Sequence, residues 1–438
     1  MSELEIGFWV LVVTTAVLLT GVPIAFGLTA VAALFLLIFE GPSGLGTVAV
    51  HFFDEINHFA LLTIPMFILF GAVIGSSGAS RDIYEALHRW LARIPGGMVV
   101  ASILACGIFS ALCGSSPATA AAIGKVGIPE MRRRGVSEGL ASGAIAAGGT
   151  LGILIPPSII LIVYGIATEQ SIGRLFLAGV VPGAMIVAIF SVYAVLSASR
   201  QRRQDSVEPE TYSLAEKIVI LPRVLPFLGL ILFVLYALYG GIATPSEIAA
   251  IVALLSALLV IVMYRQFSFQ AWRSTVAAAT RESCMILLIV GAAGFFSYTM
   301  SKLYVTQSLA EWIIGTGLEP WLFLVVVNGF LLLLGCFLPP VAIILMVMPI
   351  LQPILEAQDF NMIWFAVIMT INMEIGLITP PVGMNLYVIR GVAPDIPLMT
   401  VLRGTAPFVL LMIGSIVLLA MFPGIALWLP NLLMGASL

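Results

Sequence analysis

The chain has 438 residues, of which 61% are hydrophobic and 9% are charged, and its formal net charge is −3. A water-soluble protein of this size cannot bury so much apolar surface, and a chain without a basic region is a poor partner for nucleic acid. Apolar runs of about 18 or more residues recur along the whole length without strand-like alternation. This pattern predicts an all-α polytopic membrane protein.

The first half opens with apolar stretches between residues 6 and 75, which we expect to be membrane-crossing scaffold helices. The stretch 6–20 is short for a span, so it either crosses alone or continues into 24–40. The chain starts with Glu3 and Glu5 and without a basic residue, whereas a cleaved signal peptide begins with positive charge. We therefore expect the N-terminus to be retained.

The segment 97–128 is apolar on both sides of a Gly-Ser-Ser-Pro sequence at 114–117. Its arms, roughly 101–113 and 117–128, rise about 18–20 Å each, which is less than the roughly 30 Å thickness of the hydrocarbon core. If the segment crossed completely, the arginines at its two ends would lie on opposite sides of the membrane. We therefore predict a re-entrant hairpin with its tip at the break and both ends in the cytoplasm.

The next segment, 139–165, contains three glycines and a Pro-Pro pair within 148–158. We predict a membrane-crossing helix that is broken near mid-depth, followed by a complete crossing at 176–198. The longest polar stretch of the chain, 199–217, comes next and is expected to be a cytoplasmic linker. This orientation is typical of inner membrane proteins, because it leaves most basic residues on the cytoplasmic side.

The second half follows the same plan. Scaffold helices are expected within 218–300, and a second re-entrant hairpin at 321–354 has its tip near 336–340. A second broken helix is predicted at 361–389, and a last crossing at 406–430. With this topology only Arg174 and Lys302, of the 19 Lys and Arg residues, are expected on the outer side.

Similar motifs recur in the two halves at a nearly constant spacing. The sequence LGILIPPS at 151–158 returns as IGLITPPV at 375–382, which is 224 residues later. Several weaker matches occur in the same order, so an internal duplication is indicated. Each half has an odd number of predicted complete crossings. The copies, 1–198 and 218–438, are therefore expected to be inverted repeats.

The two tips and the two breaks are the positions where chemistry is expected. Proline removes a backbone donor and leaves carbonyl groups free one turn earlier. Inside a bilayer such groups are tolerated only where they line a cavity or meet a ligand. Free carbonyls and hydroxyls suit Na⁺, and the positive N-termini of half-helices suit an anion. The alternative is that the breaks are kinks and packing glycines.

Single polar residues give weaker signals. The sequence Thr244-Pro-Ser-Glu247 is typical of a helix start, so Glu247 is interpreted as a capping residue. Glu374 lies just before the second break, and it is either a functional carboxylate or a residue that orients the unwound segment. The four cysteines fall in apolar segments and are expected to be small buried hydrophobes. No set of catalytic residues is recognisable within the spans, so an enzyme is not expected.

Four motifs together resemble the large membrane subunit of tripartite ATP-independent periplasmic (TRAP) transporters, and most of all the C4-dicarboxylate branch. They are CGSSPATAAAIGKVGIPEM, GGTLGILIPPSIILIVYGIA, LFLAGVVPG and INMEIGLITPPVGMNLYV. The resemblance implies an elevator mechanism in a bacterial inner membrane, coupled to Na⁺ and importing an organic acid, with no cofactor. It also implies two partners, a soluble periplasmic substrate-binding protein and a small four-helix membrane subunit.

The resemblance further implies two Na⁺ sites and a substrate site between them. The first Na⁺ site would comprise Ser115, Ser116, Gly149, Gly152 and Pro156. The second Na⁺ site would comprise Gly335, Pro339, Gly376 and Thr379. The substrate would bind near Ser116, Pro157, Thr379, Pro380 and Asn385.

This chain departs from the family pattern at the second tip. Family members often carry an acidic residue there, whereas this chain reads Leu338-Pro339-Pro340. Backbone carbonyls would then do more of the binding, or the second cation site would be weaker. A competing hypothesis is a stand-alone cation-coupled anion permease or antiporter, which would transport without a binding protein.

Overall fold

The computed structural model describes residues 1–201, 211–266 and 268–435. Helices make up 83% of the structure, and none of the residues in these ranges forms a β-strand. Within the same ranges, six helices are long and apolar enough to cross a membrane. A seventh span results if the bent pair 42–56 and 59–75 counts as one. The chain is therefore a multi-pass helical membrane protein, as the sequence predicts.

The first helices settle the question of the N-terminal apolar region. They are α1 (Glu3–Leu19), α2 (Ile24–Glu40), α3 (Pro42–Leu45), α4 (Val48–Ile56), the 3-10 turn η1 (Phe59–Leu62), α5 (Thr63–Gly75) and α6 (Ala79–Leu91). The chain turns at Gly21, where φ is +82°, so 6–40 forms two helices and not one.

The predicted hairpin region forms α7 (Gly97–Cys113) and α8 (Ser116–Arg133), which pack against each other. The break between them is made by Gly114, in a left-handed conformation with φ of +66°, and by extended Ser115. The arms have 17 and 18 residues and are longer than predicted, since α8 continues through Pro129. Each arm is therefore about 25–27 Å long. A helix of this length could cross the membrane at a tilt, so the argument from short arms does not by itself establish the predicted hairpin.

The first half ends with α9 (Glu138–Gly149), η2 (Thr150–Ile153), α10 (Ile159–Ala167) and α11 (Ile172–Gln201). The predicted linker 199–217 is only partly described, because 202–210 lie outside the described residues. Its last part forms α12 (Leu214–Val219), which contacts α6. There the Trp90 indole donates to the carbonyl of Lys217 at 3.3 Å.

The second half contains one long helix and several pairs of shorter ones. They are α13 (Leu221–Tyr239), α14 (Pro245–Tyr264), α15 (Phe269–Lys302), α16 (Val305–Gly315), α17 (Pro320–Gly335), α18 (Pro340–Ala357), α19 (Met362–Leu377), α20 (Met384–Val392), α21 (Leu398–Met421) and α22 (Gly424–Met434). The single crossing expected at 406–430 is instead divided between α21 and α22. An apolar run hides this break, because hydropathy does not change at Phe422-Pro423.

Two single-residue expectations have clear outcomes. Glu247 is a capping residue, since its carboxylate accepts a hydrogen bond from the Thr244 amide at 2.8 Å at the start of α14. Cys106, Cys113 and Cys336 are buried, but Cys284 on α15 is exposed. The expectation that all four cysteines are buried is wrong for Cys284. An apolar sequence does not reveal which face of a helix points outward.

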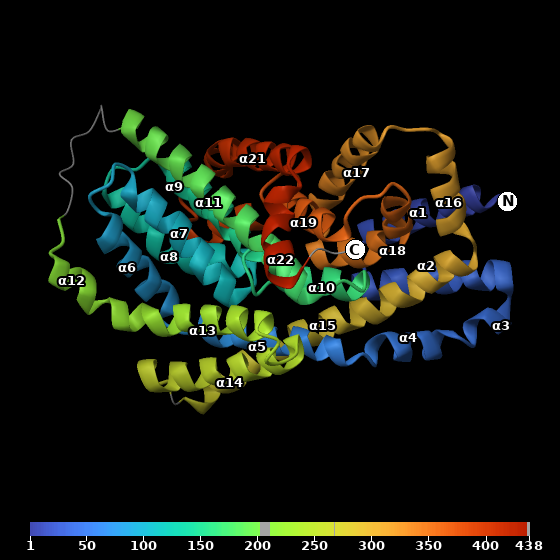
Figure 1. Ribbon diagram of the computed structural model, residues 1–438, viewed down its shortest axis with the longest axis horizontal. Helices are drawn as coiled ribbons and strands as arrows, with labels where there is room; N and C mark the ends of the chain where they lie inside the picture. The colour runs from blue at the N-terminus through green and yellow to red at the C-terminus, as the bar shows by residue number, and fades with distance from the viewer. Residues whose placement is uncertain (202–210, 267, 436–438) are drawn as a thin grey trace.

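The helices form two groups that lie along opposite sides of an elongated molecule (Figure 1). One group contains α5, α13, α14 and α15 together with α2 and α4, and these helices pack against one another. The other group contains α7, α8, α9, α11 and α21. The second group holds the first tip and the first break.

Close glycine contacts join α9 to α21 in the second group. A Cβ atom built on Gly143 would lie 2.2 Å from the Gly404 carbonyl oxygen, and one built on Gly404 would lie 1.9 Å from the Gly139 carbonyl oxygen. Helices in a bilayer associate through packing, because lipid tails are as apolar as the side chains. Small residues therefore permit this close crossing, which holds the first broken helix in place.

Candidate functional site

The first tip contacts the first break through backbone and hydroxyl oxygens. The Ser110 hydroxyl on α7 lies 2.9 Å from the Thr119 hydroxyl and 3.2 Å from the Gly149 carbonyl oxygen. A Cβ atom on Gly149 would lie 3.0 Å from the Ser116 carbonyl oxygen, and one on Gly152 would lie 1.9 Å from the Ser110 Cβ. The predicted residues Ser116, Gly149 and Gly152 are thus brought together; a Cβ atom would be tight at position 149 and would clash at position 152.

The remaining first-site residues lie on the edges of this contact. Pro156 and Pro157 are buried between η2 and α10. The Pro157 carbonyl oxygen lies 3.9 Å from where a Cβ atom on Gly114 would stand. Ser115 lines a cavity at the tip. The first predicted set therefore lies around one helix break and the tip beside it.

The second tip and the second break are also in direct contact. A Cβ atom built on Gly376 would lie 2.4 Å from the Gly335 carbonyl carbon. The Val382 amide, beyond the break, donates to the Cys336 carbonyl at 3.3 Å. The Thr379 hydroxyl donates to the Ile375 carbonyl, one turn earlier in α19. Pro339 caps the start of α18 and is partly buried.

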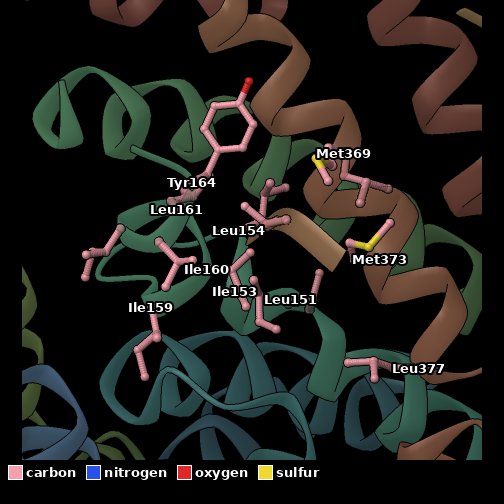
Figure 2. Packing of buried hydrophobic residues seen from close by; sticks show 14 of the residues in the cluster. Leu151, Ile153, Leu154, Ile159, Ile160, Leu161, Tyr164, Met369, Met373 and Leu377 are labelled. Atoms are coloured by element: carbon pink, nitrogen blue, oxygen red, sulfur yellow. The ribbon is translucent and has the colours of Figure 1, made fainter. Parts of the chain in front are cut away.

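The first broken helix and the second broken helix share one apolar core. Figure 2 shows side chains of η2 and α10, including Leu154 and Leu161, beside Met369 and Met373 of α19. At the far end of this core the Tyr164 hydroxyl donates to the Met362 carbonyl at 2.8 Å. The two breaks are therefore held at a fixed distance by packed side chains.

The predicted substrate residues differ in their environments. Ser116 and Asn385 are fully buried, Thr379 is partly buried and Pro380 is exposed. The Asn385 side-chain amide donates to the Ala146 carbonyl on α9 at 3.2 Å, and its oxygen has no hydrogen-bond partner. Asn385 therefore joins the second broken helix to the first.

Sequence reasoning missed several buried polar residues near the breaks. Ser110 and Thr119 bracket the first tip, and their hydroxyls meet across the hairpin. In the second half the Asn372 amide donates to the Asn328 side-chain oxygen at 2.9 Å, which ties α19 to α17. The available signal was the occurrence of these polar residues inside apolar helices.

A hydrogen bond between two buried side chains also joins the two halves of the site. The Ser116 hydroxyl donates to Oε2 of Glu374 at 2.7 Å. Glu374 is only 1% exposed, and its other oxygen, Oε1, has no hydrogen-bond partner among the described residues. A buried polar atom without a partner is unusual in a native structure, so this oxygen needs an explanation.

A cavity of about 420 Å³ lies beside the first tip. The tip contributes Cys113 and Ser115, α5 contributes Gly71 and its neighbours, and α15 contributes residues from Ser274 to Glu282. A Cβ atom on Gly71 would lie 2.3 Å from the Cys113 carbonyl oxygen, so α5 touches the tip directly. The cavity therefore lies between the tip, α5 and α15, beside the point where α5 touches the tip.

The donor atoms around the breaks fit a small hard cation better than a transition metal. The described residues contain no group of three or more His, Cys, Asp or Glu side chains that could hold a metal ion. What they do contain is buried hydroxyl and carbonyl oxygen, from Ser110, Gly149 and Ser116, and the unpartnered oxygen of Glu374. Hard cations take oxygen ligands of this kind.

The architecture can now be compared with known proteins. A family model for the tripartite ATP-independent periplasmic transporter, DctM component, matches residues 11–425. The chain belongs to this family. A C4-dicarboxylate TRAP transporter large permease protein from Pseudomonas aeruginosa is 37% identical, with 91% of this chain and 92% of that protein covered. A counterpart from Rhodobacter capsulatus is 35% identical, with 95% and 97% covered.

More distant TRAP relatives carry other substrate names. A sialic acid TRAP transporter large permease protein from Vibrio cholerae is 30% identical, with 95% of this chain and 97% of that protein covered. These relatives are transporter permease subunits and not enzymes. This TRAP subunit is therefore a transport protein, as its sequence predicts.

Two solved structures share the fold at low identity. The YdaH transporter of Alcanivorax borkumensis has a TM-score of 0.60 at 16% identity, covering 90% of each chain. MtrF of Neisseria gonorrhoeae has a TM-score of 0.59 at 14% identity, covering 89% of this chain and 85% of that one. These likenesses concern the fold alone.

Proposed function

We propose that this TRAP subunit imports an organic acid anion of the C4-dicarboxylate class, driven by a Na⁺ gradient. The observation that carries the proposal is the pair of equivalent contacts between a tip and a break. Gly149 lies against Ser116 in the first pair, and Gly376 lies against Gly335 in the second. Both contacts bury backbone oxygens, and the first also buries the Ser116 hydroxyl, in apolar surroundings that favour a bound cation.

The same pairs support an inverted repeat and an elevator mechanism. In each half two helices meet at a tip (α7–α8 and α17–α18), and a broken helix follows (α9–α10 and α19–α20). The tip pairs enter as re-entrant hairpins from opposite faces of the membrane. They move with the broken helices as one body against the scaffold, because a buried network resists distortion but can slide as a unit.

The substrate anion is bound by helix N-termini near the centre. Helices α8, α10, α18 and α20 all begin directly after a break, and each helix start carries partial positive charge. No ionised basic residue is then needed to hold a carboxylate. The names of the 37% and 35% identical relatives favour a C4-dicarboxylate among the possible organic acids.

The transporter works with two partners in the bacterial inner membrane. A soluble periplasmic protein captures the substrate and delivers it, and a small four-helix membrane subunit completes the complex. The family name, which specifies a tripartite periplasmic transporter, supports both partners. The described residues contain no separate domain outside the helical body that could capture substrate (Figure 1).

Reconstitution tests this function directly. The complete complex in proteoliposomes, with labelled succinate and the cognate binding protein, is expected to accumulate substrate only with an inward Na⁺ gradient. Omission of the binding protein is expected to abolish uptake. Uptake without the binding protein would favour the stand-alone permease or antiporter, and equal uptake without a Na⁺ gradient would refute the coupling.

A further inference from the structure

The carboxylate of Glu374 occupies a place that is costly for charge. It is buried in α19 in the apolar core, and Ser116 is its one hydrogen-bond donor among the described residues. The charged residues of the neighbouring helices lie near helix ends, as with Arg174 of α11, Arg390 of α20 and Arg403 of α21. Burying a carboxylate in an apolar core costs more free energy than burying an apolar side chain of similar size. Its shape and acceptor atoms must therefore serve a purpose.

The hydrogen bond connects all four interruptions of the helices. On one side, the Ser116 carbonyl lies against Gly149 of the first break. On the other side, Glu374 lies two residues before Gly376, and Gly376 lies against Gly335 of the second tip. A direct side-chain route from the first pair to the second thus passes through this 2.7 Å contact between residues 258 positions apart, beside the separate bond from Asn385 to the Ala146 carbonyl.

We propose that Glu374 is a positioning residue that couples the first tip-and-break contact to the second through Ser116. The inference rests on the proposed function, because it assigns the route by which the two Na⁺ sites influence each other. Ligand binding at the first pair fixes the start of α8, which places the Ser116 hydroxyl. The Glu374 acceptor then holds α19 in the position that the second pair requires.

The test compares variants that remove or retain the acceptor. In reconstituted complexes, Glu374→Ala and Ser116→Ala are each expected to lower the Hill coefficient for Na⁺ towards one. Each should raise the half-saturating Na⁺ concentration about fivefold. The double variant is expected to be no worse than the worse single variant. Glu374→Gln keeps an acceptor oxygen of the same shape, so it should recover most of the cooperativity.

Exposed Glu40, at the end of α2, supplies the matched control. Glu40→Ala is expected to leave both the Hill coefficient and the Na⁺ requirement unchanged. If Glu374→Gln is as defective as Glu374→Ala, the charge and not the hydrogen-bond geometry is needed, and the proposal is overturned. Additive defects in the double variant would also overturn it.

A second readout separates this proposal from the proposed function. Melting temperatures of the purified complex, measured without Na⁺, give a double-mutant cycle for Ser116 and Glu374 that does not depend on transport. A non-additive cycle with Na⁺-independent uptake would refute the Na⁺ coupling and leave the contact intact. Additive melting temperatures would refute the contact itself, whatever the transport assay shows.

Discussion

The hydroxyl groups near the two breaks differ in what they already bind. The Thr379 hydroxyl donates to a carbonyl of its own helix, and its oxygen can still accept or ligate. Ser115 faces the cavity at the first tip. Both are therefore available to a cation without breaking the contacts that hold the helices together.

Removing these two hydroxyls should weaken Na⁺ activation without preventing insertion. Ser115→Ala combined with Thr379→Ala is expected to raise the half-saturating Na⁺ concentration about tenfold, because each lost oxygen ligand is worth about as much as one ordinary hydrogen bond, roughly 0.5–1.5 kcal/mol. Thr29→Ala is the matched control, since Thr29 makes the same bond to a carbonyl four residues earlier on α2. An unchanged Na⁺ requirement in uptake assays would contradict these ligand assignments.

A surface ion-pair cluster allows a pH prediction outside the membrane spans. Arg132 at the end of α8 pairs with Asp395 in the loop before α21, and also with Glu138 at 2.8 Å. The hydrogen bond from Arg132 holds the pKa of the Asp395 carboxyl below its ordinary value of 3.8. A carboxyl with a lowered folded-state pKa stabilises the protein above its unfolded pKa, and this contribution disappears as pH falls through the folded value.

Asp395→Asn should therefore lower the melting temperature of the purified protein slightly at pH 7. The deficit should be small, because both partners are partly exposed, and it should shrink in high salt. It should shrink as the pH falls below the ordinary carboxyl value of 3.8 and disappear below the lowered folded-state pKa, where the wild-type carboxyl is also protonated. A deficit that does not shrink as the pH falls through this range would show that lost packing, and not charge, is responsible.

Sequence reasoning could find candidate residues but not their partners. Glu374 was an evident candidate because carboxylates are rare in apolar helices. Its two interpretations stayed open, since the donor Ser116 lies 258 residues away. Periodicity and local motifs carry no information about contacts at that separation, which only the packed fold creates.

At the scale of elements, the crossing of α9 and α21 depends on glycine. Gly404→Ala should prevent the close approach, because its Cβ atom would lie 1.9 Å from the Gly139 carbonyl oxygen. We expect the free energy of unfolding to fall by about 1–3 kcal/mol, the range seen for overpacked cores. Size-exclusion profiles and melting temperatures of detergent-purified protein measure the effect.

Gly414 on the same helix supplies the control for this crossing. A Cβ atom there would have no atom within 4 Å, so Gly414→Ala should be neutral or slightly stabilising through helix propensity. If both alanine variants behave alike, the α9–α21 contact does not limit stability.

The breaks between elements were predictable, whereas several element ends were not. Gly114 and the prolines near 156 and 380 interrupt a helix by local chemistry, so the sequence alone locates them. The ends of α7 and α8 extend further than predicted because packing against neighbouring helices keeps residues such as Pro129 helical. Hydropathy hid the division of 406–430, although Pro423 between α21 and α22 marks it by the same local chemistry.

At the scale of the whole molecule, the cavity between the tip and the scaffold-side helices has a defined charge. Among the described residues that line it, Glu282 has the one carboxyl side chain, and the others are apolar or carry hydroxyl or thiol groups. The lining holds no Lys, Arg or His. A cleft lined by one sign of charge concentrates ions of the opposite sign. The cavity should therefore admit cations more readily than anions.

Cys113 lines the same cavity and reports on this potential. In a variant in which the other three cysteines are alanine, Cys113 should react faster with a cationic methanethiosulfonate than with an anionic one. The ratio of the rates should fall about threefold in Glu282→Gln, because one nearby charge is lost at partly screened distance. Arg281→Gln, which changes the adjacent charge outside the lining, should leave the ratio nearly unchanged.

Equal rates for both reagents in the presence of Glu282 would show that the carboxylate does not control the potential at the tip. Because labelling needs no transport, that outcome would stand whether or not Na⁺ drives uptake.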